Sequence, residues 1–359
     1  MSLVTRCGAT GQPPLGYAGL LNLEAQPHHT VVLSDYPLPQ ADVLRLRRHL
    51  SKAATRLLFG RIDRGVPAVW RDLKNNGVDI RRDYVSLQGI VSRHENVFRI
   101  HDLLNRLSRG DVARLDLPLA EAGFRPSHAT HLLRVVMQAD YAEQDSIADS
   151  FFALLDQKRP YEVTAHTRDA ATLRITDDTG WFGLAGRLRA GEFRTLPAGE
   201  VTYPGSRIDG AFVVDGAILA SPEHPDAAGE ALRLGRMSSE LRDHPLRLAI
   251  TAGRVTGVSG RGKLATAISR LIEGDPRYGF VTEVGISFNR ACTKFIHRWG
   301  AASNEGRPGV HIAIGGDPDH RDGQAMRGDA LVHLDLMAAN CHVFVNGSPF
   351  LRASSSESQ

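Results

Sequence analysis

The spacing of apolar positions divides the chain into a helix-like first part and a strand-like second part. Apolar side chains recur at helical spacing over residues 41–59, 100–107, 127–139 and 142–157. After Pro160, which ends a helix, short runs alternate between apolar and polar positions and glycine turns become more frequent. We therefore predict an α+β protein, with a mainly helical N-terminal domain over residues 28–159 and a strand-rich mixed α/β domain over residues 160–351.

Individual elements can be predicted within these two parts. In the first part, residues 31–33 read as a short strand. In the second part, residues 263–273 form the clearest helix, and Thr251-Ala252-Gly253 is typical of a hairpin turn. The expected strands of the second part are residues 163–168, 171–176, 212–214, 247–250, 254–258 and 342–345.

The two ends of the chain lack apolar periodicity. Residues 1–27 are rich in glycine and proline, and residues 352–359 are polar. We expect a flexible arm at the first end and a disordered tail at the second.

Composition and charge narrow the classes of partner. The 359 residues include 43 Lys and Arg against 40 Asp and Glu, and the net charge of +3 is spread along the chain, so no nucleic-acid partner is indicated. No segment approaches the ~18 apolar residues of a membrane span, and no N-terminal export signal is present. Cys7, Cys292 and Cys341 are too far apart for a cysteine zinc motif or a disulfide framework. We expect a cytoplasmic protein without a membrane partner.

Four segments carry residues that could do chemistry. His333 and Asp335 alternate with leucines, so a strand would place both on one face; the alternative is a hydrogen-bonded pair at a strand rim. His311 opens an apolar strand that ends at two glycines, and by itself it reads as structural. Glu283 lies in an uncharged stretch, where a buried carboxylate needs a partner. Glu200 follows a Pro and Gly turn and by itself reads as an exposed turn residue.

Together these five residues form a mixed set of oxygen and nitrogen ligands. Such a set suits a divalent metal, namely zinc, cobalt, manganese or ferrous iron. The sequence thus predicts a metal site formed by Glu200, Glu283, His311, His333 and Asp335.

Several short motifs follow one another in a recognisable order. They are Thr176-Asp177-Asp178-Thr179-Gly180, residues 196–201, residues 208–216, Thr282-Glu283-Val284-Gly285, residues 311–315, His333-Leu334-Asp335 and Val345-Asn346-Gly347. This order resembles that of the aminopeptidase T family of metallopeptidases, over roughly residues 160 to 350. The resemblance implies a pair of divalent cations held by the five ligands named above, and a homodimer.

The chain also resembles 2,5-dihydroxypyridine dioxygenase, which shares the fold of these aminopeptidases. This second resemblance implies one ferrous iron held by two histidines and a carboxylate. Aminopeptidases of this kind carry a tyrosine soon after the motif histidine, but residues 316–320 contain none. Glu200 and His320 are the catalytic candidates, and His320 or Tyr203 could replace that tyrosine. The first ~130 residues show no counterpart of the family's N-terminal domain.

Three functions therefore stay open. The first is a metal-dependent aminopeptidase, and the second is a mononuclear iron dioxygenase acting on an aromatic ring. The third keeps the cleft to hold a peptide, such as a precursor peptide, without turning it over; peptide-binding proteins of ribosomal-peptide pathways, such as those for crocagin, would be examples, although no motif carries that comparison. We expect a peptide-handling protein, and the sequence leaves open whether it is an enzyme.

Overall fold

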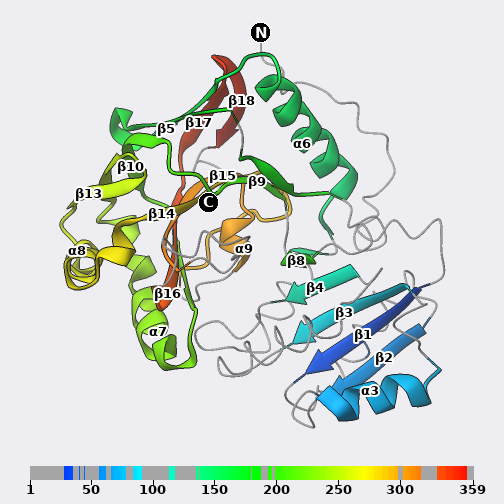
Figure 1. Cartoon of the computed structure of the whole chain (residues 1–359). Helices are drawn as coiled ribbons and strands as arrows, with labels where there is room; N and C mark the ends of the chain where they lie inside the picture. The colour runs from blue at the N-terminus through cyan, green and yellow to red at the C-terminus, as the bar shows by residue number, and fades with distance from the viewer. Residues whose placement is uncertain are drawn as a thin grey trace.

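The described residues form three β-sheets, with helices packed beside them (Figure 1). The computed structural model describes residues 28–34, 40, 44, 56–61, 66–77, 84–90, 113–117, 135–136, 138–178, 180–186, 193–195, 199–297, 302–316 and 330–353. These ranges confirm the predicted α+β class.

The largest sheet is antiparallel and has seven strands, in the order β13-β12-β10-β6-β5-β17-β18. Its strands are β5 (Tyr161–Thr167), β6 (Thr172–Asp177), β10 (Ile208–Val214), β12 (Leu246–Thr251), β13 (Arg254–Ser259), β17 (Cys341–Val345) and β18 (Ser348–Ala353). The six strands predicted in the second part of the chain lie here, and β12 and β13 form the predicted hairpin.

The second antiparallel sheet has the order β11-β16-β15-β14-β9-β7. Its strands are β7 (Phe182–Leu184), β9 (Glu200–Tyr203), β11 (Ile218–Pro222), β14 (Val281–Ser287), β15 (Gly309–Gly315) and β16 (Val332–Ala338). Strands β15 and β16 are buried along their whole length, so each of them has both faces covered.

One face of this second sheet contributes to the main hydrophobic core. Ile312, Leu334 and Val284 belong to the same buried cluster as Leu173 and Leu248 of the seven-stranded sheet. The two sheets therefore share a core. The other face of the second sheet does not contribute to this core.

Four helices accompany these sheets, namely α6 (Tyr141–Leu155), α7 (Ala228–Arg236), α8 (Lys263–Gly274) and the short α9 (Ala302–Glu305). Helix α6 begins after Asp140, whose carboxylate accepts hydrogen bonds from the amides of Ala142 and Glu143 at 3.1 and 2.9 Å. It buries Phe151 and Leu155 and packs against β9 and β17. Helices α6 and α8 confirm the helices predicted over residues 142–157 and 263–273.

The third sheet is parallel and has the order β2-β1-β3-β4-β8. It contains β1 (His28–Ser34), β2 (Arg56–Arg61), β3 (Tyr84–Ile90), β4 (Ala113–Leu117) and β8 (Phe193–Thr195), and α3 (Val66–Asn75) follows β2. Strand β1 confirms the strand predicted over residues 31–33.

This sheet corrects two expectations. The described part of residues 28–159 contains four parallel strands, so it is less helical than expected, and β2 overlaps the end of the helix predicted over residues 41–59. Short apolar runs such as that of β2 do not distinguish a strand of a parallel sheet from a helix. Strand β8 pairs with β4, so the division expected at residue 160 does not separate the sheets.

Other expectations lie outside the described residues. They concern the arm over residues 1–27, the part of the predicted tail over residues 354–359, the helix over residues 100–107 and Cys7. The first two residues of the predicted tail, Arg352 and Ala353, instead pair in strand β18. Cys292 and Cys341 are buried free thiols. In the part of the chain that the structure describes, no helix combines the length and the apolar character needed to cross a membrane.

Candidate metal centre

The register of four neighbouring strands brings the predicted ligands to one face of the second sheet. His311 of β15 is paired with Gly285 of β14, and Asp335 of β16 is paired with Ala313 of β15. Residues paired across antiparallel strands share a face, and so do residues two apart along a strand. The same face therefore carries Glu200, Glu283, His311, His333 and Asp335. The opposite face carries the residues of the hydrophobic core.

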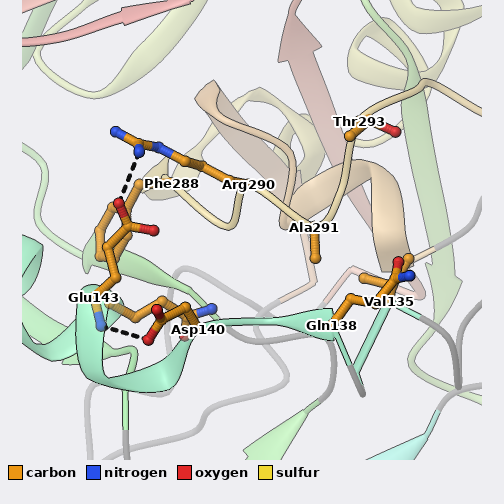
Figure 2. Close-up of a pocket in the computed structure, with 9 residues that line it drawn as sticks. Val135, Gln138, Asp140, Glu143, Phe288, Arg290, Ala291 and Thr293 are labelled. Carbon is orange, nitrogen blue, oxygen red and sulfur yellow. Dashed lines mark hydrogen bonds and ion pairs between the residues drawn. The ribbon is translucent and has the colours of Figure 1, made fainter. Parts of the chain in front are cut away.

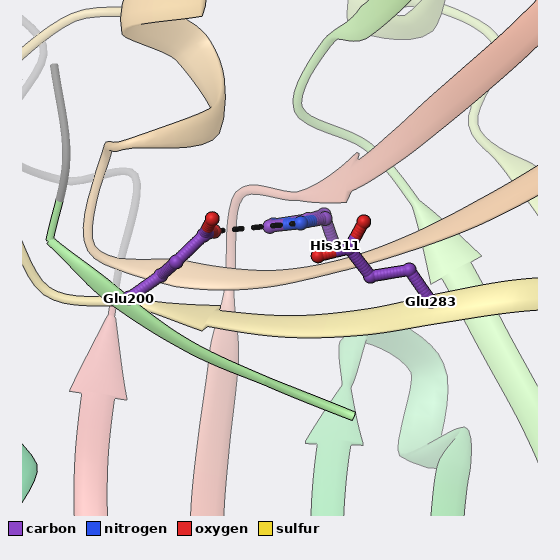
Figure 3. A group of neighbouring side chains, drawn as sticks. All are labelled: Glu200, Glu283 and His311. Carbon is purple, nitrogen blue, oxygen red and sulfur yellow. Dashed lines mark ion pairs between the residues drawn. The ribbon is translucent and has the colours of Figure 1, made fainter. Parts of the chain in front are cut away.

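The ligand atoms form three overlapping groups among the described residues. Within each group, one nitrogen or oxygen atom from every residue lies within 4.8 Å of the others. The groups are Glu200, Glu283 and His311; Glu283, His333 and Asp335; and Glu305, His311 and Asp335. Figure 3 shows the first group, with Glu200 and Glu283 pointing toward the His311 ring. All five predicted ligands thus lie in one cluster.

The His311 ring presents an unused nitrogen to this cluster. Its Nε2 atom is buried, has no hydrogen-bond partner among the described residues, and lies 3.6 Å from Oε2 of Glu200 and 3.8 Å from Oε1 of Glu305. Burial lowers the pKa of His311 to about 4, so the ring is neutral near pH 7. A neutral imidazole with a free lone pair beside carboxylates is the state in which histidine binds a metal.

Gly285 makes room for that ring. A Cβ atom on residue 285 would lie 2.0 Å from Cε1 and 2.2 Å from Nε2 of His311, far inside contact distance. Together with Ala313 and Gly315, this glycine keeps the face between the ligands free of bulky side chains.

His333 is oriented by a backbone carbonyl. Its Nδ1 atom lies 2.6 Å from the Gly316 oxygen, and its Nε2 atom lies 3.0 Å from Oδ1 of Asp335. Burial by itself would lower the pKa of His333, but the Asp335 carboxylate outweighs it and holds this pKa well above its ordinary value. With that pKa the ring carries both protons, so Nδ1 donates to the carbonyl and Nε2 donates to the carboxylate; a cation bound between His333 and Asp335 would displace the Nε2 proton.

Two hydroxyl groups orient the glutamates. Thr202 donates to Oε1 of Glu283, and Ser287 donates to Oε2 of Glu200 at 3.2 Å. Both hydroxyl residues lie on the ligand face, since Thr202 is paired with Gly285 and Ser287 with Glu200. Such partners fix the direction of a carboxylate before it binds a cation.

Glu305, at the end of α9, is a member of the cluster that the sequence did not reveal. Burial, and then the negative charges of Glu200, Asp335 and Glu283, raise the pKa of Glu305 well above its ordinary value. In the sequence, Glu305 is visible only as a carboxylate six residues before His311. The periodicity of that segment does not distinguish Glu305 from an exposed residue of a turn.

The donor set fits divalent cations. Four carboxylates and two imidazoles meet in a buried space, and such a concentration of negative charge is unfavourable unless protons or cations compensate it. The free His311 nitrogen, which lies beside Glu200 and Glu305, is the ligand atom that is open to a cation.

Tyr203 and His320 were the two residues expected to replace the tyrosine that is missing from residues 316–320. Tyr203 belongs to the opposite face of β9, where its hydroxyl donates to Asp177, so it does not face the cluster. His320 lies outside the described residues.

Three motif residues outside the cluster have structural partners. Asp215 accepts from the Ala339 amide at 2.6 Å and from the Asn340 side chain at 2.9 Å. The Asn346 side chain accepts from the Glu162 amide at 2.9 Å and donates to the Leu154 carbonyl at 2.7 Å. Asp177 accepts a hydrogen bond from the Tyr203 hydroxyl. These three residues therefore connect elements of the fold rather than bind a ligand.

The fold and the cluster together define a protein with an aminopeptidase T-like fold and a candidate metal centre. AmpT from Thermus thermophilus has a similar structure, with a TM-score of 0.51, 16% identity, and coverage of 93% of this chain and 94% of that chain. A 2,5-dihydroxypyridine dioxygenase from Pseudomonas putida KT2440 is also similar, with a TM-score of 0.57, 12% identity, and coverage of 95% of each chain. At these identities the similarity establishes the fold.

A more particular match comes from the sequence itself. Residues 196–344 match the family described as crocagin biosynthetic protein CgnE/B. The matched range contains every residue of the metal cluster. No curated protein sequence matches the chain significantly.

Proposed function

We propose that this chain is a metal-binding, peptide-handling protein of a peptide natural-product pathway. The observation that carries the proposal is the cluster of six ligands, in which Glu283, His311 and Asp335 are each shared by two groups. Shared ligands favour two adjacent cations over one, and zinc, cobalt, manganese and ferrous iron all suit the donor set. The match to a crocagin biosynthetic family supports a pathway that uses peptides.

Bound cations would supply Lewis acidity toward a carbonyl or carboxylate oxygen of the peptide. The chain's own residues hold the ligands in place, because Thr202 and Ser287 fix two carboxylates and Gly316 fixes the His333 ring. The peptide itself is a precursor or substrate that reaches this face of the sheet.

We infer that binding is stronger than turnover. On the ligand face of β9, β14, β15 and β16, the described side chains beside the ligands are small or already donate to Glu200 and Glu283. Among the described residues of this face, no side chain therefore adds an electrophilic group for a developing oxyanion to the cations themselves, and removing one such donor can cost about 100-fold or more in rate. Ground-state binding needs no such group.

The alternatives differ in metal content and reaction. A metal-dependent aminopeptidase would use the same two cations, with Glu200 as base and His320 as electrophile. A mononuclear iron dioxygenase would use one group alone. Glu283, His333 and Asp335 form one such group, with one histidine and two carboxylates in place of the two histidines and one carboxylate of the dioxygenase that the chain resembles.

Metal analysis followed by peptide assays tests these functions. Protein purified without chelator, and then loaded with zinc, cobalt or manganese, is offered unblocked peptides while first-residue release and calorimetric affinity are measured. We expect two metal equivalents and binding with little release. Rapid multiple turnover would establish the aminopeptidase, one iron with oxygen consumption would establish the dioxygenase, and failure to bind metal would reject the proposal.

A homodimer is part of the same proposal. It rests on the resemblance to the aminopeptidase T family, whose members are typically dimers. Light scattering coupled to gel filtration measures it directly, and the mass of a single 39.1 kDa chain would reject it.

A further inference from the structure

A pocket of about 320 Å³ lies between the start of α6 and the loop after β14 (Figure 2). Its walls include Val135, Glu143, Gln144, Phe288, Arg290 and Ala291. The volume is at the lower end of the range for small-ligand sites, about 300 to 1,000 Å³, so the pocket suits a group of about one amino-acid residue.

Gln144 places an unused hydrogen-bond donor in this wall. The side chain is only 2% exposed, and its Oε1 atom accepts from the Gly186 amide at 3.2 Å. That bond fixes the orientation of the amide, and its Nε2 atom then has no hydrogen-bond partner among the described residues. Since buried polar atoms are nearly always paired, the free donor points to a ligand acceptor.

Gly199 lies close to Gln144 of the pocket wall and directly precedes Glu200 of the ligand cluster. A Cβ atom on Gly199 would lie 3.1 Å from Nε2 of Gln144, and φ of this residue is +132°. The next residue is Glu200, and the Gly199 carbonyl accepts from the Phe288 amide at 2.7 Å. One peptide bond thus connects the residue beside Gln144 to the first ligand of the cluster.

The charges at the pocket cancel each other. Arg290 and Glu143 form an ion pair at 2.7 Å, and the Arg290 side chain is 62% exposed (Figure 2). The carboxylate of Asp140 is used by the first amides of α6. What remains are the neutral polar groups of Gln138, Gln144 and Thr293 beside the apolar Val135, Phe288 and Ala291. Such a lining suits a neutral main-chain carbonyl with an apolar side chain and disfavours a free carboxylate.

We propose that this pocket binds the peptide residue next to the one held at the metal centre. The main-chain carbonyl of that residue accepts a hydrogen bond from Nε2 of Gln144, and its apolar side chain packs against Phe288, Val135 and Ala291. This inference rests on the proposed function for the identity of the ligand as a peptide, whereas the pocket itself does not depend on the metal.

The test uses the zinc-loaded full chain and one neutral probe, N-acetyl-leucine N-methylamide, titrated by saturation-transfer NMR. Wild type binds this probe more tightly than it binds N-acetyl-leucine, whose carboxylate is charged. Gln144→Met removes the donor at similar volume and weakens binding about fivefold to thirtyfold, the effect of one lost hydrogen bond. Gln157→Met makes the same exchange at an exposed position outside the pocket and leaves binding unchanged.

A second variant does not touch Gln144. Ala291→Phe fills the pocket from the loop side and abolishes probe binding, and it keeps the Ala291 amide bond to Asn289. If wild type does not bind the probe, or if both variants bind it as wild type does, the pocket proposal is overturned.

Metal content is measured in the same samples to separate the two proposals. Two metal equivalents and a longer peptide bound independently of Gln144 and Ala291 would reject the pocket and leave the proposed function standing. A metal-free wild type that still binds the probe in a Gln144-dependent way would reject the proposed metal centre and keep the pocket.

Discussion

Individual ligands of the cluster are not equivalent. Glu283 belongs to two of the three groups among the described residues, whereas Glu200 belongs to one. Oxygen atoms of a shared carboxylate can contact two cations, so the loss of Glu283 affects both positions.

We predict that Glu283→Gln removes most of the bound metal, whereas Glu200→Gln removes about one of two equivalents. The substitution keeps the side-chain volume and removes the charge that attracts a cation. Elemental analysis of zinc-loaded, dialysed protein measures this. Equal losses in the two variants would mean that Glu283 is not shared.

Gly285 allows a second prediction at the scale of the residue. Gly285→Ala places a Cβ atom 2.0 Å from the His311 ring and must displace it, so metal affinity falls about tenfold or more. Zinc titration against a competing chelator measures this affinity.

The matched control for this change is Gly257→Ala in β13. Its Cβ atom would meet only Ala249 at 3.5 Å, an ordinary contact. Metal affinity that falls equally in both variants would mean a general effect of alanine in a strand rather than a clash with the ring.

At the scale of elements, hydrogen-bonded polar groups connect strands that are far apart in the sequence. Tyr203 of β9 donates to Asp177 at the end of β6, and this bond joins the two antiparallel sheets. Burial by itself would raise the pKa of Asp177, but the Tyr203 and Asp178 hydrogen bonds and the Arg207 charge outweigh it and lower this pKa.

We therefore predict that Tyr203→Phe destabilises the protein in a pH-dependent way. A depressed carboxylate pKa stabilises the fold above the unfolded value of about 3.9, and this contribution is lost as the pH falls through the folded value. The variant should lose about 1.5–3 kcal/mol at pH 7, the contribution of a hydrogen bond to a charged group. Urea unfolding at pH 7 and near pH 3 measures both values, and a gap that does not narrow at low pH would contradict the role of Asp177.

Asn346 connects α6 and β5 to the hairpin of β17 and β18, and its φ of +51° lies in the left-handed region. We predict that Asn346→Gly costs about 1–3 kcal/mol through the lost side-chain bonds. Asn346→Ala should cost about 1 kcal/mol more, because alanine disfavours this backbone conformation. Thermal unfolding of both variants decides this, and equal costs would mean that the backbone conformation contributes nothing.

These elements also show which strands could be predicted from the sequence. Period-two alternation correctly indicated six strands of the seven-stranded sheet, all except β18, and placed His333 and Asp335 together, because one face of a strand is set by spacing alone. The parallel strands β2, β3 and β4 were not recognised. The apolar run of β2 lacks that alternation, whereas β3 and β4 alternate over only four or five residues.

The rest of the cluster depends on contacts between distant segments. Glu305 reaches the ligands through a helix of four residues, and Gln144 reaches Gly199 from α6, which lies 55 residues earlier in the chain. Neither contact leaves a periodic signal in the sequence, because packing between elements is set by the tertiary fold.

At the scale of the whole molecule, the two antiparallel sheets are complete without most of the N-terminal region. Their strands all lie between Tyr161 and Ala353, and α6 packs on them from Tyr141 onward. Only the three-residue strand β8 of this range pairs with the parallel sheet.

We predict that a fragment of residues 135–353 folds and binds the same number of metal equivalents as the full chain. Its core is intact, and among the strand pairings of the described residues it loses that of β8 with β4. Thermal unfolding and elemental analysis of both proteins test this. An aggregated or metal-free fragment would show that the parallel sheet is needed to assemble the site.

The placement of the ligands on adjacent strands determines where the length of the chain can vary. Inserting one residue between His311 and Gly315, or between His333 and Asp335, would turn the following side chains to the opposite face and exchange ligands for leucines and isoleucines. Insertions between Gly316 and Ala330 would leave the paired strands in register. Chains that share this site should therefore keep constant spacing within β14, β15 and β16, and should differ in length mainly in the connections between these strands.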